Sequence, residues 1–162
     1  MEIPIVTALY CDIVPTPIGP VRLLGSEDAI EQLFLTEDGP PPGAVLRPNF
    51  GGFAARLRAY FGGDVQALET LPVNPPGTPF QQEVWRELRR VGPGSTVSYG
   101  ELAKRVQRPD ASRAVGMANA RNPVALVIPC HRVIGSNGKL TGYAYGLDAK
   151  RWLLRHEGAL LL

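Results

Sequence analysis

The residues best suited to chemistry are the neighbours Cys130 and His131, which Pro129 separates from the apolar run Val124 to Ile128. A lone cysteine in such a place is usually a small core residue. The adjacent imidazole changes that expectation, because a base beside a thiol is the arrangement that activates a cysteine nucleophile. The chain has one other histidine, His156. The pair therefore predicts a reactive thiol.

The chain geometry limits how this thiol can lose its proton. Adjacent residues in an extended segment point in different directions, so a direct bond between the thiol of Cys130 and the ring of His131 is awkward. We expect a bridging water to carry the proton, and a carboxylate on the far ring nitrogen to fix the tautomer and stabilise the cation. Glu157, which follows His156, is the candidate carboxylate.

Two elements are expected to position these groups. A buried strand over residues 124–128 would end at Pro129 and present Cys130. A helix over residues 148–157 would carry Glu157 at its end, where Gly158 favours a left-handed backbone.

Two helices upstream predict a helix-turn-helix. Ser98 and Glu101 form a capping box that opens a helix through Val106, and Arg108-Pro109 breaks it. Asp110 can cap a second helix that runs to about residue 121. The second helix is rich in small residues, which suit close approach to a nucleic acid groove or, equally, to a neighbouring helix. These are Ala111, Ala114, Gly116, Ala118 and Ala120.

The rest of the chain predicts a mixed α/β (α+β) fold in two domains. Short strands are expected over residues 3–14, 21–24 and 30–35, and apolar residues at helical spacing predict a helix that ends at Gly62-Gly63. Residues 74–77 look like a linker, and a capping box of Thr78 and Gln81 starts a new helix. We expect an N-terminal domain over residues 1–77, with a small antiparallel sheet and a helix. A mostly helical C-terminal domain would cover residues 78–162.

Charge is divided unevenly between the halves, although the net charge is only +2. Residues 1–78 hold 4 Lys and Arg against 9 Asp and Glu, whereas residues 79–162 hold 13 against 6. A basic half predicts a polyanionic partner, with nucleic acid first, although a solvated basic face explains the charge equally well.

Other classes of protein are disfavoured. The start of the chain lacks a basic signal region, and no apolar run approaches the roughly 20 residues that span a bilayer. We therefore expect a cytoplasmic protein without a membrane partner. Cys11 and Cys130 form no CxxC pair, so neither a disulfide framework nor a structural metal site is expected.

Several segments resemble the O6-alkylguanine-DNA alkyltransferases in order and spacing, over about residues 78–158. The most specific is the Pro-Cys-His-Arg-Val run over residues 129–133, while the first half resembles the family only in its turn over residues 16–20 and in its layout. The segments that carry the resemblance are Thr78-Pro79-Phe80-Gln81, Ser98-Tyr99, Arg113-Ala114-Val115-Gly116, Asn122-Pro123, residues 128–134, Gly142-Tyr143 and His156-Glu157-Gly158.

The resemblance implies DNA repair by direct reversal of damage. The protein would flip O6-alkylguanine out of duplex DNA and transfer the alkyl group to Cys130, irreversibly and once, and O4-alkylthymine is a second implied substrate. It also implies an N-terminal ribonuclease-H-like roll and a helix-turn-helix of winged-helix type. The molecule would be a monomer that approaches double-stranded DNA from the minor groove and needs no metal or cofactor.

Residue roles follow from the same resemblance. His131 would be the water-linked base, Glu157 its partner, and Asn122 would hold the turn between the recognition helix and the Cys130 segment. Tyr99 would crowd the target phosphate and bond the flipped base, while Arg113 would enter the base stack in its place. The other implied DNA and substrate contacts are Ala114, Val133, Tyr143, Ala144 and Tyr145.

The sequence departs from the family at three places. The family commonly has a pair of glycines where this chain reads Tyr145-Gly146, so a phenol replaces a hydrogen beside the expected pocket and can limit the size of the alkyl group. Gln107 stands where a helix-terminating glycine is usual, which predicts a more strained corner. The zinc ligands that some relatives carry in the first half have no counterpart, since Cys11 alone cannot form such a site.

Two alternatives belong to other functional classes. The chain could be a winged-helix or alkyltransferase-like DNA binder that recognises lesions without repairing them, although such relatives replace the acceptor cysteine that is kept here. It could also be a thiol hydrolase using Cys130, His131 and Glu157, which would need an oxyanion hole and turnover.

Overall fold

The computed structural model describes residues 9–159, so the part of the first expected strand before Leu9 lies outside the described residues. The N-terminal half forms a four-stranded sheet in the order β3-β2-β1-β4. Strands β1 (Tyr10–Val14), β2 (Val21–Gly25) and β3 (Ile30–Leu35) are antiparallel neighbours, as expected. The short β4 (Val45–Leu46), which was not predicted, pairs parallel with β1.

A 3-10 turn η1 (Phe50–Gly52) leads into α1 (Phe53–Phe61), which covers the sheet and confirms the predicted helix. Its apolar face buries Phe53, Leu57 and Tyr60, the spacing of one helical stripe.

The C-terminal half contains the expected helices. Helix α2 (Pro79–Leu88) and helix α3 (Tyr99–Arg105) both start with the predicted capping box. Helix α4 (Ser112–Ala120) completes the helix-turn-helix with α3, and the Trp85 indole N–H ties α2 to α4 by donating to the carbonyl of Ala118 at 2.9 Å. The mixed α+β class is confirmed.

The remaining elements join the segment that contains Cys130 to helices α2, α3 and α4. Strand β5 (Val97–Ser98) pairs parallel with β6 (Val133–Ile134), which follows the 3-10 turn η2 (Cys130–Arg132). Helix α5 (Leu147–His156) ends as expected: Gly158 has φ 83°, and the N–H groups of Gly158 and Ala159 donate to the carbonyls of Arg155 and Leu154. Glu157 is thereby fixed just after the helix.

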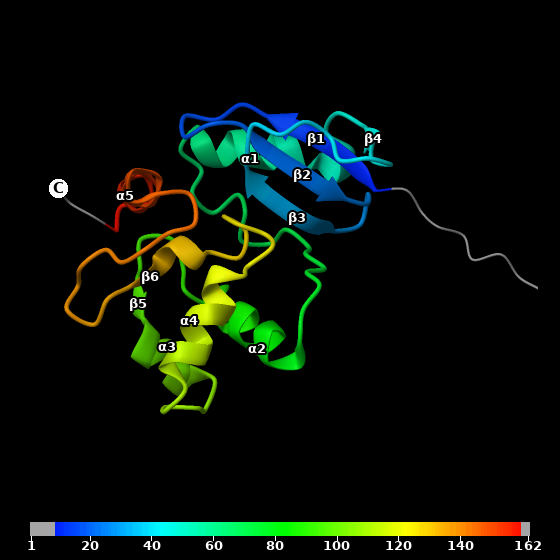
Figure 1. Ribbon diagram of the computed structural model, residues 1–162. Coiled ribbons are helices and arrows are strands. Elements are labelled where there is room, and N and C mark those ends of the chain that lie inside the picture. Colours follow the sequence, from blue (N-terminus) through cyan, green and yellow to red (C-terminus); the bar gives the residue numbers. More distant parts are fainter. Residues whose placement is uncertain (1–8, 160–162) are drawn as a thin grey trace, which may run out of the picture.

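The two halves share one core. In Figure 1 the sheet and α1 lie above α2, α3 and α4, and the segment between α4 and η2 runs between them. Two isolated β-bridges join β3 to later parts of the chain. Leu33 pairs with Val124 of the C-terminal half, and Ile30 pairs with Val73 of the connecting segment. Buried apolar residues of both halves form one cluster. The division at residue 77 stays a prediction. Among the described residues, no helix is long and apolar enough to cross a membrane.

Two predictions about local structure were wrong. Asp110 does not cap the second helix, because the N-cap is Ala111, whose N–H closes a turn on the carbonyl of Arg108 at 2.9 Å. Residues 124–128 are buried as expected but are a series of turns, not a strand, and Leu126 has φ 71°. An apolar run cannot distinguish these outcomes, since both bury it.

Asn122 supplies the hydrogen bonds that make this buried turn possible. Its side-chain oxygen accepts from the N–H of Val124 at 2.9 Å, and its amide donates to the carbonyl of Ile128 at 2.7 Å. One side chain thus satisfies both ends of a backbone segment that has no full strand partner.

The corner of the helix-turn-helix is strained at Gln107, as the sequence predicts. Gln107 has φ 61°, and the N–H groups of Gln107 and Arg108 donate to the carbonyls of Lys104 and Ala103, the Schellman pattern that favours glycine. A side chain in this left-handed region costs roughly 1 kcal/mol.

Gln107→Gly is therefore expected to raise the free energy of unfolding by about 0.5–1 kcal/mol, since it removes the clash while keeping the turn. Denaturant unfolding measures the change. Gln107→Ala is the matched control: it keeps the Cβ and should bring no gain. Equal stability of the glycine and alanine variants would contradict the strain at this corner.

Candidate active site

Cys130 lines a pocket of about 630 Å³ between the two halves of the molecule. Of the residues expected at the site, Tyr99, Asn122, Cys130, Tyr143, Ala144 and Tyr145 line it. His131, Val133 and Glu157 are buried behind it, whereas Arg113 and Ala114 are exposed on α4. The pocket is thus built from residues far apart in the chain.

The Cys130 thiol is held in a buried environment that keeps it protonated at rest. Only 7% of the residue is exposed. Burial raises the pKa of the thiol, although the Asn122 amide and the Lys150 ammonium act in the opposite direction. A base that removes the proton during the reaction is therefore needed, rather than a standing thiolate.

His131 is placed to be that base. Its Nε2 donates to Glu157 Oε2 at 2.8 Å, with both side chains fully buried. Because the carboxylate accepts a hydrogen bond from Nε2, Nε2 carries the ring proton and Nδ1 carries the free lone pair. Within the described residues, Nδ1 has no hydrogen-bond partner. Burial lowers the pKa of His131 although Glu157 acts to raise it, and the ring is neutral near pH 7.

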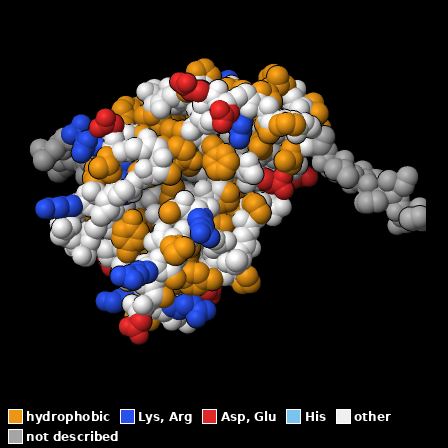
Figure 2. Space-filling view, in the orientation of Figure 1, with side chains coloured by type: hydrophobic (Ala, Val, Ile, Leu, Met, Phe, Trp, Pro, Cys, Tyr) orange, Lys and Arg blue, Asp and Glu red, His pale blue; other side chains and the backbone are white. Residues whose placement is uncertain are grey.

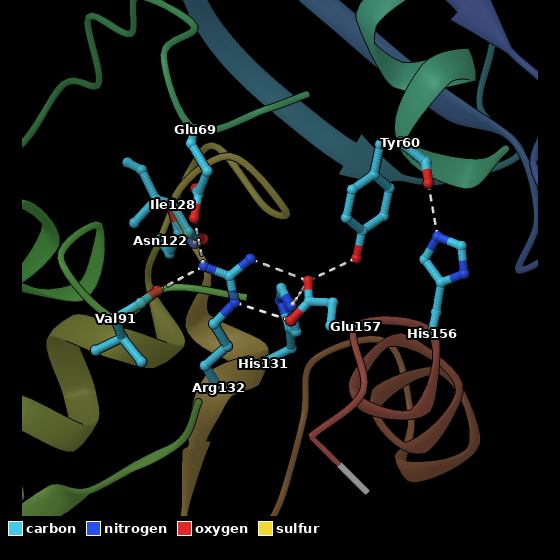
Figure 3. Close-up of polar contacts among 9 residues, drawn as sticks. All are labelled: Tyr60, Glu69, Val91, Asn122, Ile128, His131, Arg132, His156 and Glu157. Atoms are coloured by element: carbon cyan, nitrogen blue, oxygen red, sulfur yellow. Dashed lines mark hydrogen bonds and ion pairs between the residues drawn. The ribbon is translucent and has the colours of Figure 1, made fainter. Parts of the chain in front are cut away.

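Arg132 holds Glu157 in place, a role that the sequence did not predict. Its Nε donates to Oε1 at 2.9 Å and its second guanidinium nitrogen to Oε2 at 3.0 Å, as Figure 3 shows. The same guanidinium donates to the carbonyl of Val91 at 2.6 Å and contacts Glu69 at 3.3 Å. Burial alone would raise the pKa of Glu157, but His131 and Arg132 together lower it to about 2.

Two tyrosines form one wall of the pocket. The rings of Tyr143 and Tyr145 meet edge to face with centroids 5.5 Å apart. Tyr145 is half-buried, and burial raises its pKa to about 12, so it is neutral at physiological pH. The Tyr145 ring, which the sequence places beside the expected pocket, does line it.

This arrangement of a pocket thiol, a buried histidine–carboxylate pair and a helix-turn-helix coincides with clear similarity to known proteins. Residues 79–159 match the family described as 6-O-methylguanine DNA methyltransferase, DNA binding domain. The chain belongs to this family. The resemblance in the sequence is thereby confirmed.

Relatives of the 6-O-methylguanine DNA methyltransferase family extend the match to the N-terminal half. A methylated-DNA–protein-cysteine methyltransferase of Shigella flexneri is 55% identical over 118 residues, which are 73% of this chain and 69% of that protein. One of Methanosarcina acetivorans is 45% identical over 156 residues, covering 93% and 99%. The crystal structure of Mycobacterium tuberculosis OGT in complex with DNA is 40% identical with a TM-score of 0.82, covering 93% of each chain.

The methyltransferase fold presents a basic surface over α3 and α4. We define this basic surface as five exposed residues, Lys104, Arg105, Arg108, Arg113 and Arg121. Figure 2 shows Lys and Arg side chains gathered over this lower part of the molecule. Tyr99 lies beside it, and its hydroxyl is 3.2 Å from Thr141 Oγ1.

Three residues near the site of this methyltransferase were missed by sequence reasoning. Lys150 is fully buried, and its ammonium donates to the carbonyl of Val133 at 2.6 Å and to those of Thr141 and Gly142 at 3.4 Å. Phe34 of β3 and Asn119 of α4 line the pocket. A lysine in an amphipathic helix and a phenylalanine in a strand carry no local signal of such positions.

Proposed function

We propose that this protein repairs DNA by taking the alkyl group of O6-alkylguanine onto the sulfur of Cys130. The observation that carries the proposal is the pocket thiol with the His131–Glu157 pair behind it. The enzyme class, methylated-DNA–protein-cysteine methyltransferase, is that of the curated relatives, and binding to DNA is in keeping with the family.

The chemistry requires one proton transfer and one substitution. The thiol proton passes through a bridging water to His131 Nδ1, and Glu157 stabilises the imidazolium that forms. The sulfur then attacks the alkyl carbon, the carbon–oxygen bond breaks with its electron pair staying on the guanine, and the guanine takes up one proton, which balances the proton that the thiol gave to His131. The product is a thioether with no second nucleophile to release it, so the protein acts once.

The substrate must leave the duplex to reach the thiol. The O6 atom of guanine lies inside the double helix, and extruding the nucleotide costs a few kcal/mol. Arg113, exposed in the first turn of α4, is long and planar enough to fill the gap in the stack, while Tyr99 contacts the extruded base. Ala114 lets the helix approach the minor groove, and the monomer suffices for all these contacts. O4-alkylthymine presents an equivalent alkyl ether and is a second substrate.

Peptide mass spectrometry tests the proposal directly. The protein is mixed with excess duplex containing O6-methylguanine, and the expected result is one methyl group on the peptide that contains Cys130, with one equivalent of DNA repaired. Binding without any gain of mass would instead indicate a non-catalytic lesion binder. Repeated turnover with an unmodified thiol would indicate a hydrolase.

Tyr145 is expected to limit the size of the alkyl group. Its ring lines the pocket against Tyr143, and a closely packed wall has little spare volume. Tyr145→Gly should raise the rate with O6-benzylguanine DNA relative to the rate with O6-methylguanine DNA by roughly tenfold, the scale of a relieved packing conflict. Tyr145→Phe, which keeps the ring, should leave the ratio unchanged. A ratio that falls or stays the same in the glycine variant would show that the ring does not restrict the pocket.

A further inference from the structure

The hydroxyl of Tyr60, from the N-terminal half, reaches the carboxylate behind the active site. It donates to Glu157 Oε2 at 2.6 Å, and both residues are buried (Figure 3). The same oxygen accepts from His131 at 2.8 Å and from Arg132 at 3.0 Å, whereas Oε1 accepts only from Arg132 among residues 9–159. Three donors therefore share the oxygen on which His131 depends.

Contacts of both the ring and the backbone carbonyl hold Tyr60 in place. Its ring packs edge-on against Phe61 at 5.0 Å and against His156 at 5.1 Å between centroids. Its backbone carbonyl accepts from His156 Nε2 at 2.6 Å, so the end of α1 is tied to the end of α5 next to Glu157. The hydroxyl proton is not lost, since burial raises the pKa of Tyr60 far above its ordinary value. The phenol thus acts as a constant donor in a fixed place.

The charges around the His131–Glu157 pair determine the electrostatic effect of the Tyr60 hydroxyl. Besides Tyr60, the charged and titratable groups near His131 and Glu157 in the described part of the chain are Arg132, Lys150, Cys130 and Tyr143. Glu69 lies one contact further away, against Arg132, and His156 packs on the ring of Tyr60. Arg132 already orients the carboxylate, because its guanidinium donates one hydrogen bond to each of the two carboxylate oxygens. Beyond helping to hold Glu157, the hydroxyl of Tyr60 withdraws negative charge from Oε2, the oxygen that stabilises a proton on His131.

We propose that Tyr60 is a positioning residue for the alkyl transfer, which makes the N-terminal half part of the catalytic apparatus: by sharing Glu157 Oε2 with His131, it keeps His131 an uncharged proton acceptor. The mechanistic part of this proposal rests on the proposed function. The effect on His131 is a property of the folded protein and can be measured without DNA.

Tyr60→Phe keeps the ring and removes only the hydroxyl. More negative charge then remains on Oε2 for His131, the imidazolium becomes more stable, and the pKa of His131 rises. The rate of transfer is lost as pH falls through this pKa, so the acid limb of the rate profile should move to higher pH by about one unit. Nitrogen NMR titration of the full chain follows His131 separately from His156, the only other histidine.

Tyr10→Phe is the matched control, because it removes a tyrosine hydroxyl that accepts a hydrogen bond from exposed Arg47, far in sequence from His131 and Glu157. Its His131 titration and acid limb should coincide with those of the wild type, and thermal unfolding verifies that both variants fold. A His131 titration in Tyr60→Phe that is unchanged or moves to lower pH overturns the inference. If the wild type fails to take up a methyl group while the titration moves as expected, the proposed function fails and the coupling between Tyr60 and His131 stands.

Discussion

Cys130→Ser is expected to abolish uptake of the methyl group while the affinity for DNA containing O6-methylguanine changes by no more than about twofold. An alcohol is a far weaker nucleophile than a thiol at the same site, whereas binding depends on phosphate contacts and base extrusion, neither of which uses the sulfur. The basic surface over α3 and α4 is unchanged by the substitution. Whole-protein mass after reaction and DNA binding at fixed salt measure the two effects.

Cys11→Ala is the control for this experiment, because Cys11 is the other cysteine and is fully buried in β1, opposite Leu24 of β2. Burial raises the pKa of its thiol too, but Cys11 does not line the pocket. This variant should take up one methyl group at the rate of the wild type. Methylation that persists in Cys130→Ser, or that disappears in Cys11→Ala, would show that Cys130 is not the acceptor.

Local signals in the sequence were read correctly at most places where the contacts are also local, and the cap expected at Asp110 is the exception. The capping boxes of Thr78 with Gln81 and Ser98 with Glu101 join residues three apart, so the start of each helix is determined by a few neighbouring side chains. The left-handed residue after α5 was likewise marked by Gly158. The same backbone state at Gln107 was anticipated as strain because the expected glycine is absent.

The other failed or missing predictions depend on contacts between distant residues. The run over residues 124–128 is buried between β3 and the helices, and Asn122 rather than a neighbouring strand satisfies its ends. Arg132 reads as an exposed cation, yet Glu157 lies 25 residues away in sequence and makes its burial possible. Tyr60 is separated from Glu157 by 97 residues. No periodicity or spacing within a segment reports such pairs.

Glu157→Gln is expected to slow the transfer by roughly a hundredfold, because the substitution keeps the shape of the side chain but removes the charge that stabilises protonated His131. The imidazolium becomes less stable, so the pKa of His131 falls further. The acid limb of the rate profile should therefore move to lower pH, opposite to the change expected for Tyr60→Phe. Single-turnover rates as a function of pH measure both effects.

The same substitution should alter stability in a defined window of pH. The pKa of Glu157 is lowered from the usual 4.5 to about 2, so its ionised form stabilises the folded protein above about pH 4.5, and this contribution is lost as pH falls toward 2. Removing the carboxylate also leaves Arg132 buried with Glu69 as its one remaining acidic partner in the described part of the chain. We expect a loss of about 3 kcal/mol in the free energy of unfolding at pH 7 and a smaller loss near pH 2.

Glu69→Gln separates the two roles of this carboxylate, since Glu69 contacts Arg132 at 3.3 Å but makes no hydrogen bond to His131. It should cost less stability than Glu157→Gln, because Glu69 is partly exposed and Arg132 keeps its two bonds to Glu157. Its rate and acid limb should match the wild type. An equal loss of rate in both variants would mean that Glu157 acts only by packing around Arg132, and an unchanged rate and pH profile in Glu157→Gln would remove Glu157 from the reaction.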